Sequence, residues 1–371
     1  MYLLRPILLF LFLLLAAKSL SHKVILVSLD GFRWDYIDLA KNAGRNVSAF
    51  EEIAAAGFRA EVKNVFPTVT FSTHFSIATG RYVENHGLYN NQFWDPRIKR
   101  QFSVRVPADS IDPVFLNFNK NEPIWITNQR HGKRSCIFYW PGNHTGHRYG
   151  PDSKEILDAI QHVNNGISYI LKRIKDNPNL NGKVNLIVTA DHGMAQIPPE
   201  NRINLFEAVT IDKYFGNLSP GLVGLWPNEP YNARHIYNEI VSKRLKNCSV
   251  WLKEDLPERF HLKGSYRMPP VFVLGDVGFL INREEKQYDT EKDRRMHPFM
   301  VASGPDIKVL EGLQLLEQID IYPFICALLG LQHPNRIDGR LERVMSFMKT
   351  EPSQDFITTF KKYEIGLLAI D

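Results

Sequence analysis

Two short apolar runs in this chain each lead into charged residues that are followed closely by glycine. The run 24–29 ends in Asp30-Gly31, and the run 184–189 leads through an alanine into Asp191-His192-Gly193. In α/β sheets, ligands bind beyond the carboxyl ends of the strands. Carboxylate and imidazole groups at such a strand end are ligands for a divalent cation. The two runs therefore predict strand ends that share a cation site, as in a metal-assisted hydrolase.

Apolar runs rich in β-branched residues alternate with segments of helical spacing. The expected strands are 23–29, 60–66, 134–139, 184–189, 271–274 and 299–302. The expected helices are 48–56, 70–79, 153–175 and 322–329. This alternation predicts an α/β fold, with a parallel sheet that carries helices on both faces. No internal repeat or flexible linker divides the chain, and residues 222–267 are expected to form a subsidiary lobe within it.

The N-terminus has the pattern of a secretory signal peptide. Arg5 precedes an apolar run over 7–17, which is short for a membrane span and leads into small residues such as Ser19 and Ser21. We expect a signal peptide over 1–21, a secreted catalytic domain over 22–345 and a C-terminal tail over 346–371. An uncleaved signal anchor is the alternative for the first segment. After the signal peptide, we expect no transmembrane segment.

Glycosylation signals and composition agree with a secreted enzyme that acts on small molecules. Sequons for N-glycosylation stand at Asn46, Asn143, Asn217 and Asn247. The three cysteines allow at most one disulfide. The 45 basic and 40 acidic residues give a formal net charge of +5, spread along the chain. Without a basic stripe, a nucleic acid duplex is not an expected partner.

A hydroxyl-rich segment over 68–73 stands at the start of the expected helix 70–79. A hydroxyl at a helix N-terminus meets free N–H groups and the positive end of the helix dipole, which favour an alkoxide and bind phosphate. Together with Asp30 and Asp191-His192, the segment predicts a metal-bound nucleophile for phosphoryl transfer. A plain helix cap, and a structural Asp beside a buried His, are the alternatives.

Six short motifs occur in a fixed order along the chain. They are Leu29-Asp30-Gly31-Phe32-Arg33-Trp34-Asp35-Tyr36, Phe66-Pro67-Thr68-Val69-Thr70-Phe71, Thr79-Gly80-Arg81-Tyr82, Glu84-Asn85-His86-Gly87, Pro123-Ile124-Trp125 and Ala190-Asp191-His192-Gly193-Met194. This set resembles the ectonucleotide pyrophosphatase/phosphodiesterase family in its short form. The resemblance extends from about Lys23 to about Gly339.

The resemblance implies an alkaline-phosphatase-like fold, with a doubly wound, mostly parallel sheet flanked by helices. It also implies hydrolysis of phosphodiester or pyrophosphate bonds in a nucleotide or other small phosphodiester, with two zinc ions and Thr70 as nucleophile. Residues matching Asp30, Asp191 and His192, with Thr70 as fourth ligand, hold one zinc in the family. Phe71 matches the aromatic residue that stacks on the substrate base. Asn91 matches the asparagine that donates to a phosphate oxygen.

The second zinc site departs from the family pattern. Of its three ligands only His147 is present, because Asn143 stands in the place of an aspartate and Lys286 in the place of a histidine. Gly142 runs directly into Asn143, where the family has a long segment, so the chain has an apparent internal deletion. His144 and His297 are possible substitutes, and each also fits a surface or packing role.

Three interpretations follow. The first is an active zinc phosphodiesterase whose sequence is a shortened form of an intact enzyme. The second is a catalytically impaired relative that acts as a binding protein. The third is a choline-phospholipid phosphodiesterase of the same fold.

Overall fold

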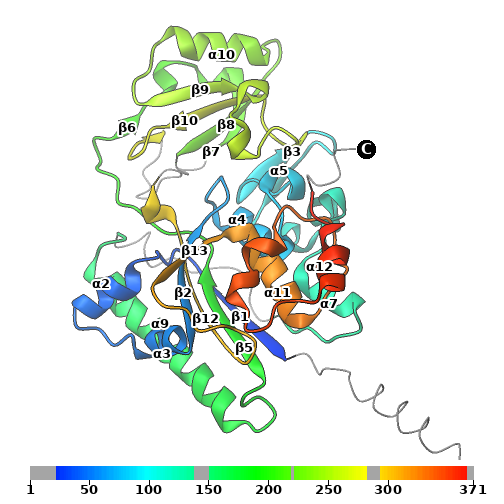
Figure 1. Ribbon diagram of the computed structural model, residues 1–371. Helices are drawn as coiled ribbons and strands as arrows, with labels where there is room; N and C mark the ends of the chain where they lie inside the picture. The colour runs from blue at the N-terminus through cyan, green and yellow to red at the C-terminus, as the bar shows by residue number, and fades with distance from the viewer. Residues whose placement is uncertain (1–21, 138–149, 219–220, 282–292, 366–371) are drawn as a thin grey trace, which may run out of the picture.

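The fold is seen in a computed structural model that describes residues 22–137, 150–218, 221–281 and 293–365 (Figure 1). Its centre is a five-stranded sheet in the order β1-β5-β12-β2-β13. These strands span Lys23–Leu29 (β1), Val184–Ala190 (β5), Phe299–Ser303 (β12), Gly57–Lys63 (β2) and Leu313–Glu317 (β13). The expected signal peptide lies outside the described residues, as do Asn143, His144, His147 and Lys286.

The directions of the strands confirm an α/β sheet and add one reversal. β1 pairs with β5 in parallel, and β2 pairs with β13 in parallel. β12 runs antiparallel to both of its neighbours, β5 and β2. The chain enters β12 from the edge where β5 ends, since the Gly193 N–H donates to the Met296 carbonyl just before this strand begins. The chain therefore has to run back along the sheet.

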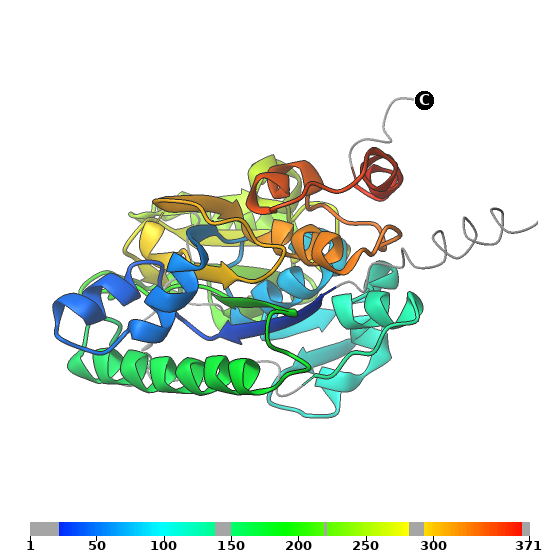
Figure 2. The same ribbon diagram turned by 60° about the horizontal axis from the view of Figure 1, so that its bottom comes forward.

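Helices cover both faces of this sheet, as expected (Figures 1 and 2). Buried side chains of one helix layer form a single apolar cluster with β1, β5 and β12. That layer contains α2 (Tyr36–Asn42), α3 (Ser48–Ala55) and α9 (Lys154–Asp176). A second cluster joins the sheet to the opposite layer. This layer contains α4 (Thr70–Thr79), α7 (Ile124–Arg130), α11 (Ile321–Leu329) and α12 (Gln354–Lys361).

The helix α9 shows how local sequence sets these elements. The Ser153 hydroxyl accepts a hydrogen bond from the Ile156 N–H and caps the helix. Ile156, Ile160 and Ile167 are buried on one stripe against the sheet. The structure confirms the expected helix to within one residue at each end.

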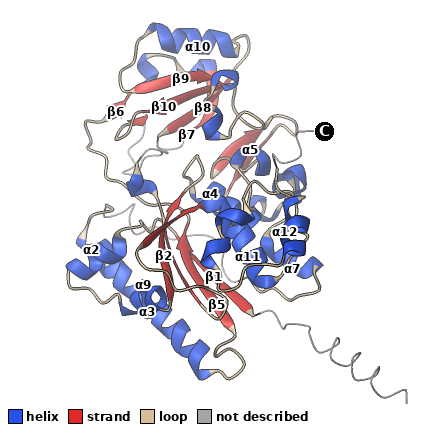
Figure 3. Ribbon diagram, in the orientation of Figure 1, coloured by secondary structure: helices blue, strands red, loops and turns tan. Residues whose placement is uncertain are grey.

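A second sheet stands beside the first (Figure 3). Its four antiparallel strands have the order β7-β8-β10-β9 and carry α10. They span Tyr214–Leu218 (β7), Leu222–Pro227 (β8), Val271–Gly275 (β10) and Cys248–Leu252 (β9), with α10 over Ala233–Ser242. The expected lobe over 222–267 contains two of these strands and α10. Its boundaries stay a prediction.

Short elements complete the described fold. They are α5 (Val83–His86), α6 (Pro113–Leu116), β3 (Gln92–Asp95), β4 (Arg100–Ser103), β6 (Arg202–Ile203) and β11 (Leu280–Ile281). The expected strand over 134–139 differs, because residues 134–137 form no strand. Asn128 holds this segment instead, since its side-chain amide donates to the Arg134 carbonyl and the Ser135 hydroxyl.

The end of the described chain packs on the core. Phe347, Phe356 and Phe360, from the segment expected as a tail, join the cluster beneath α11. Among the described residues, no helix combines the length and apolar character that crossing a membrane requires.

Candidate active site

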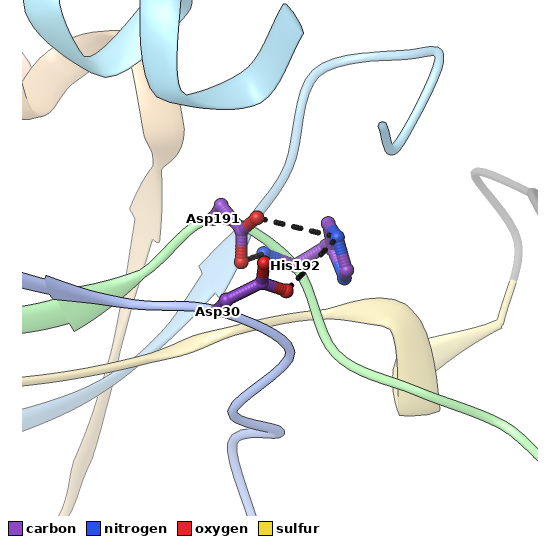
Figure 4. A group of neighbouring side chains, drawn as sticks. All are labelled: Asp30, Asp191 and His192. Carbon is purple, nitrogen blue, oxygen red and sulfur yellow. Dashed lines mark hydrogen bonds and ion pairs between the residues drawn. The ribbon is translucent and has the colours of Figure 1, made fainter. Parts of the chain in front are cut away.

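Three side chains meet at the carboxyl edge of β1 and β5 (Figure 4). In the parallel pair, Leu29 lies opposite Ala190, so Asp30 and Asp191 leave their strands at the same level. One ligand atom from each of Asp30, Asp191 and His192 lies within 4.8 Å of the others. Their side chains are at most 5% exposed. The structure thus brings together the strand-end residues that the sequence predicts as neighbours.

Backbone donors hold the Asp191 carboxylate. Its Oδ1 accepts hydrogen bonds from the Gly31 N–H at 2.9 Å and from the His192 N–H at 2.7 Å. Gly31 has a φ of +66°, a conformation that glycine adopts without strain. Burial raises the pKa of the Asp191 carboxyl, but the rings of His192 and His74 and the Gly31 hydrogen bond outweigh it and hold that pKa below its usual range. Asp191 is therefore an anion.

The His192 ring is oriented by its own backbone neighbour. Its Nδ1 lies 2.7 Å from the Gly193 carbonyl oxygen, which only accepts hydrogen bonds, so Nδ1 carries a proton. In the neutral ring, the lone pair is then on Nε2, which faces the carboxylates. A histidine that binds a metal commonly donates its other N–H to such a group.

The three residues fit a zinc ion. Asp191 Oδ2 is buried, has no backbone donor in the described part of the chain, and lies 3.2 Å from His192 Nε2. Asp30 Oδ1 lies 3.8 Å from the same nitrogen. Two ligands about 2.0 Å from a tetrahedral zinc are about 3.3 Å apart. The first separation matches that spacing and the second is somewhat longer, and two carboxylates with one imidazole are a suitable donor set.

Thr70 supplies a hydroxyl beside this group. It is the first residue of α4, is only partly exposed, and its Oγ1 lies 3.2 Å from His192 Nε2. The preceding residue, Val69, makes no side-chain hydrogen bond that caps the helix. The hydroxyl of Thr70 points to the cluster, so a plain cap does not describe it.

Asn91 reaches the same helix end from a neighbouring loop. Its Oδ1 accepts a hydrogen bond from the Phe71 N–H at 3.0 Å. This bond assigns the amide oxygen to the helix, because a backbone N–H needs an acceptor. The side-chain NH2 of Asn91 is then the group that it can offer to a ligand.

The Phe71 side chain is more buried than the accessible ring expected from the sequence. It is 8% exposed, and its ring centroid lies 5.2 Å from that of Phe102. It belongs to an aromatic cluster beneath α4. Stacking of this ring on a substrate base stays a prediction.

The residues expected around the second zinc are mostly outside the described part. His297 is described, and its Nδ1 lies 2.7 Å from Glu61 Oε1. Burial raises the pKa of Glu61, but hydrogen bonds from Arg294 and His297 outweigh burial and lower it. His297 therefore has a carboxylate partner of its own, which agrees with a packing role.

Two of the predicted sequons lie on exposed backbone. Asn46 and Asn247 are exposed, and Asn46 Oδ1 accepts a hydrogen bond from the Ser48 N–H. Asn217 is part of β7, and Asn143 lies outside the described residues. Glycosylation at these positions stays a prediction.

The sequence did not reveal two residues that hold the site. Gln318 is fully buried, donates to the Asp191 carbonyl oxygen at 2.6 Å and accepts from the Val65 N–H at 3.2 Å. His74 lies one helical turn after Thr70 and also contacts Asp191. The spacing of four residues from Thr70 was the available signal for His74, since it puts both on one face of a helix. No local signal links Gln318 to the site.

This chain matches one family model and several known proteins. Residues 24–145 and 142–300 match the family model described as type I phosphodiesterase / nucleotide pyrophosphatase. The bis(5′-adenosyl)-triphosphatase ENPP4 of Homo sapiens is 32% identical over 386 residues, covering 86% of this chain and 81% of the relative. The Homo sapiens ectonucleotide pyrophosphatase/phosphodiesterase family member 5 is 29% identical over 385 residues, covering 86% and 78%.

Solved structures show the same fold. The human ectonucleotide pyrophosphatase/phosphodiesterase 5 superposes with a TM-score of 0.78 at 28% identity, covering 89% of this chain and 100% of that chain. The murine protein, as an inactive threonine-to-alanine variant in complex with AMP, gives a TM-score of 0.77 at 27% identity, with coverage of 89% and 100%. The alkaline-phosphatase-like α/β fold is thereby confirmed.

The matches also locate the gap expected from the sequence. The two matching segments meet at residues 142–145, where Gly142 precedes Asn143. The alignment with human ENPP4 runs over 386 residues, more than the 371 residues of the whole chain. The relative therefore contains residues without a counterpart here.

Proposed function

Because the chain belongs to the type I phosphodiesterase / nucleotide pyrophosphatase family of hydrolases, we propose that it is a secreted, zinc-dependent enzyme that cleaves phosphoanhydride or phosphodiester bonds of nucleotides with Thr70 as nucleophile. One observation carries the proposal. A hydroxyl at the N-terminus of α4 lies 3.2 Å from the nitrogen of a buried Asp, Asp, His group. A helix cap or a structural salt bridge does not require that arrangement.

Each residue of the site has its own role in the proposed reaction. Asp30, Asp191 and His192 hold the cation, which when bound stabilises negative charge on oxygen at this edge. The oxygen of Thr70 forms a bond to phosphorus while the bond from phosphorus to the leaving group breaks, and the hydroxyl proton passes to solvent water. The Asn91 side-chain NH2 donates to a phosphate oxygen. Water then cleaves the phosphothreonine ester and regenerates Thr70.

The relatives support a nucleotide substrate. Human ENPP4 is named for cleavage of a bis(5′-adenosyl) triphosphate, and the murine relative binds AMP. That relative is inactive with alanine in place of a threonine, which supports a threonine nucleophile. A diadenosine triphosphate is therefore the first substrate to test, and nitrophenyl phosphorylcholine tests the choline-phospholipid alternative.

A second candidate function has an observation of its own. The family match is interrupted at 142–145, beside Asn143 and close to His147. These are residues of the expected second zinc site. With one complete cation site, the chain is expected to turn its substrate over weakly but still to bind nucleotides. A catalytically impaired binding protein is therefore the competing proposal.

Assays on the secreted chain decide between the two. Hydrolysis of diadenosine triphosphate and of a nitrophenyl nucleotide ester is measured with and without a zinc chelator, for the natural chain and for Thr70→Ala. The matched control is Thr358→Ala, since Thr358 is an exposed residue of α12 whose hydroxyl donates to the Gln354 carbonyl. The enzyme proposal expects turnover that the chelator and Thr70→Ala abolish and Thr358→Ala preserves. Nucleotide binding without turnover in the natural chain supports the impaired protein.

A further inference from the structure

His74 is buried directly behind the candidate active site. The residue is 2% exposed and lies on α4, one turn after Thr70. Its Nδ1 lies 2.9 Å from the Thr70 carbonyl oxygen and 3.4 Å from Asp191 Oδ2. On the other side of the ring, its Nε2 lies 3.0 Å from the Ser28 hydroxyl.

The chemistry of these neighbours assigns a proton to Nδ1. The Thr70 carbonyl and the Asp191 carboxylate only accept hydrogen bonds, so the nitrogen between them has to be a donor. Ser28 has a hydroxyl, which adapts to whichever state Nε2 has. The ring is therefore oriented with a donor toward Asp191 and Thr70.

One imidazole thus joins three segments that carry the site. Ser28 lies on β1 two residues before Asp30, Thr70 begins α4, and Asp191 follows β5. Asp191 Oδ1 has two backbone donors, whereas Oδ2 lies 3.4 Å from His74 Nδ1 and 3.2 Å from His192 Nε2. His74 therefore contacts the same carboxylate oxygen of Asp191 as the expected cation ligand His192.

We propose that His74 is a positioning residue, which holds the Asp191 carboxylate and the first turn of α4 in place so that Asp191 and Thr70 can serve one cation. The inference rests on the proposed function, because it assumes that this cation binds. Groups that orient metal ligands commonly account for a 10- to 100-fold difference in metal affinity. His74 has no part in bond making in the proposed reaction.

Three substitutions separate the two sides of the ring. His74→Asn keeps an amide donor at the position of Nδ1, toward Thr70 and Asp191. His74→Gln keeps a polar group at the position of Nε2, toward Ser28. His74→Phe keeps the ring and removes both polar contacts. Zinc affinity is measured on the full secreted chain by competition with a chromophoric chelator, and the melting temperature is recorded without zinc.

The expected result is a zinc dissociation constant raised about 10- to 100-fold in His74→Gln and His74→Phe, with most of the affinity restored in His74→Asn. A purely structural residue would lower the melting temperature of the zinc-free chain and leave zinc affinity unchanged. Unchanged affinity in His74→Gln overturns the inference, as does an equal loss in His74→Asn and His74→Gln. A natural chain that binds no zinc would instead refute the proposed function, and this inference with it.

Discussion

Leu29 of β1 and Ala190 of β5 face each other in register at the end of a parallel strand pair. Each is followed by an aspartate, and the two aspartates with His192 form the candidate cation site. Because the two strands run parallel and in register, the residues that follow them meet at one edge of the sheet. This relationship makes the site a consequence of the central sheet.

Substitutions of Asn91 test whether its side-chain NH2 donates to the substrate phosphate at the start of α4. We expect Asn91→Asp to keep the cap on the Phe71 N–H and to retain the melting temperature, because the acceptor oxygen is preserved. The same change removes the NH2 donor and adds a negative charge near the substrate phosphate. Turnover should fall about 10²- to 10³-fold, the usual cost of losing such a donor.

Asn91→Ala is the companion variant in steady-state kinetics and thermal melts. It should lose both activity and about 1 kcal/mol of stability, because the helix cap is also lost. Equal activity in Asn91→Asp and the natural chain would show that the side-chain NH2 does not contact the transition state.

His86 predicts a pH dependence of stability. Burial, with a smaller contribution from Arg81, lowers the pKa of His86 to about 3 in the folded chain. The unfolded chain has a histidine pKa near 6.5, so between these values the unfolded state binds more protons. Stability therefore falls as pH falls below about 6.5, by about 1.4 kcal/mol per pH unit from this residue.

The variant His86→Asn isolates that contribution. Asn keeps an acceptor for the Leu88 N–H, which His86 Nδ1 now accepts, and does not titrate. Denaturant unfolding at a series of pH values from 7 to 4 should show a shallower loss of stability in the variant. Parallel curves for the two proteins would contradict a neutral, buried His86.

Much of this architecture follows from sequence because its signals are local. The alternation of runs gave the helices on both faces, and the two strand ends placed Asp30, Asp191 and His192 together. The reversed direction of β12 and the hydrogen bond from Gln318 to Asp191 depend on contacts between residues far apart in the chain. The burial of Phe71 also needs its aromatic neighbours, which no spacing around residue 71 indicates.

Gly193 tests how closely the site packs on the chain before β12. A Cβ added there would lie 2.0 Å from the Arg295 carbonyl oxygen, so backbone has to move. We expect Gly193→Ala to cost about 1–3 kcal/mol and to weaken zinc binding, since His192 precedes it. Chemical denaturation measures the first effect and chelator competition the second.

The control for that substitution is Gly166→Ala. Gly166 lies inside α9, and an added Cβ meets no atom within 4 Å. Alanine is the better helix former, so stability should rise by up to about 1 kcal/mol with zinc affinity unchanged. A Gly193→Ala chain as stable as the Gly166→Ala chain would contradict the close packing at Arg295.

The metal content of the purified chain tests the candidate site most directly. Elemental analysis after dialysis against trace zinc should find about one zinc per natural chain and per Asp176→Ala chain, since Asp176 lies exposed at the end of α9. The Asp191→Ala chain should contain none, provided that circular dichroism shows it folded. Zinc retained in folded Asp191→Ala, or absent from the natural chain, would contradict a cation site formed by Asp30, Asp191 and His192.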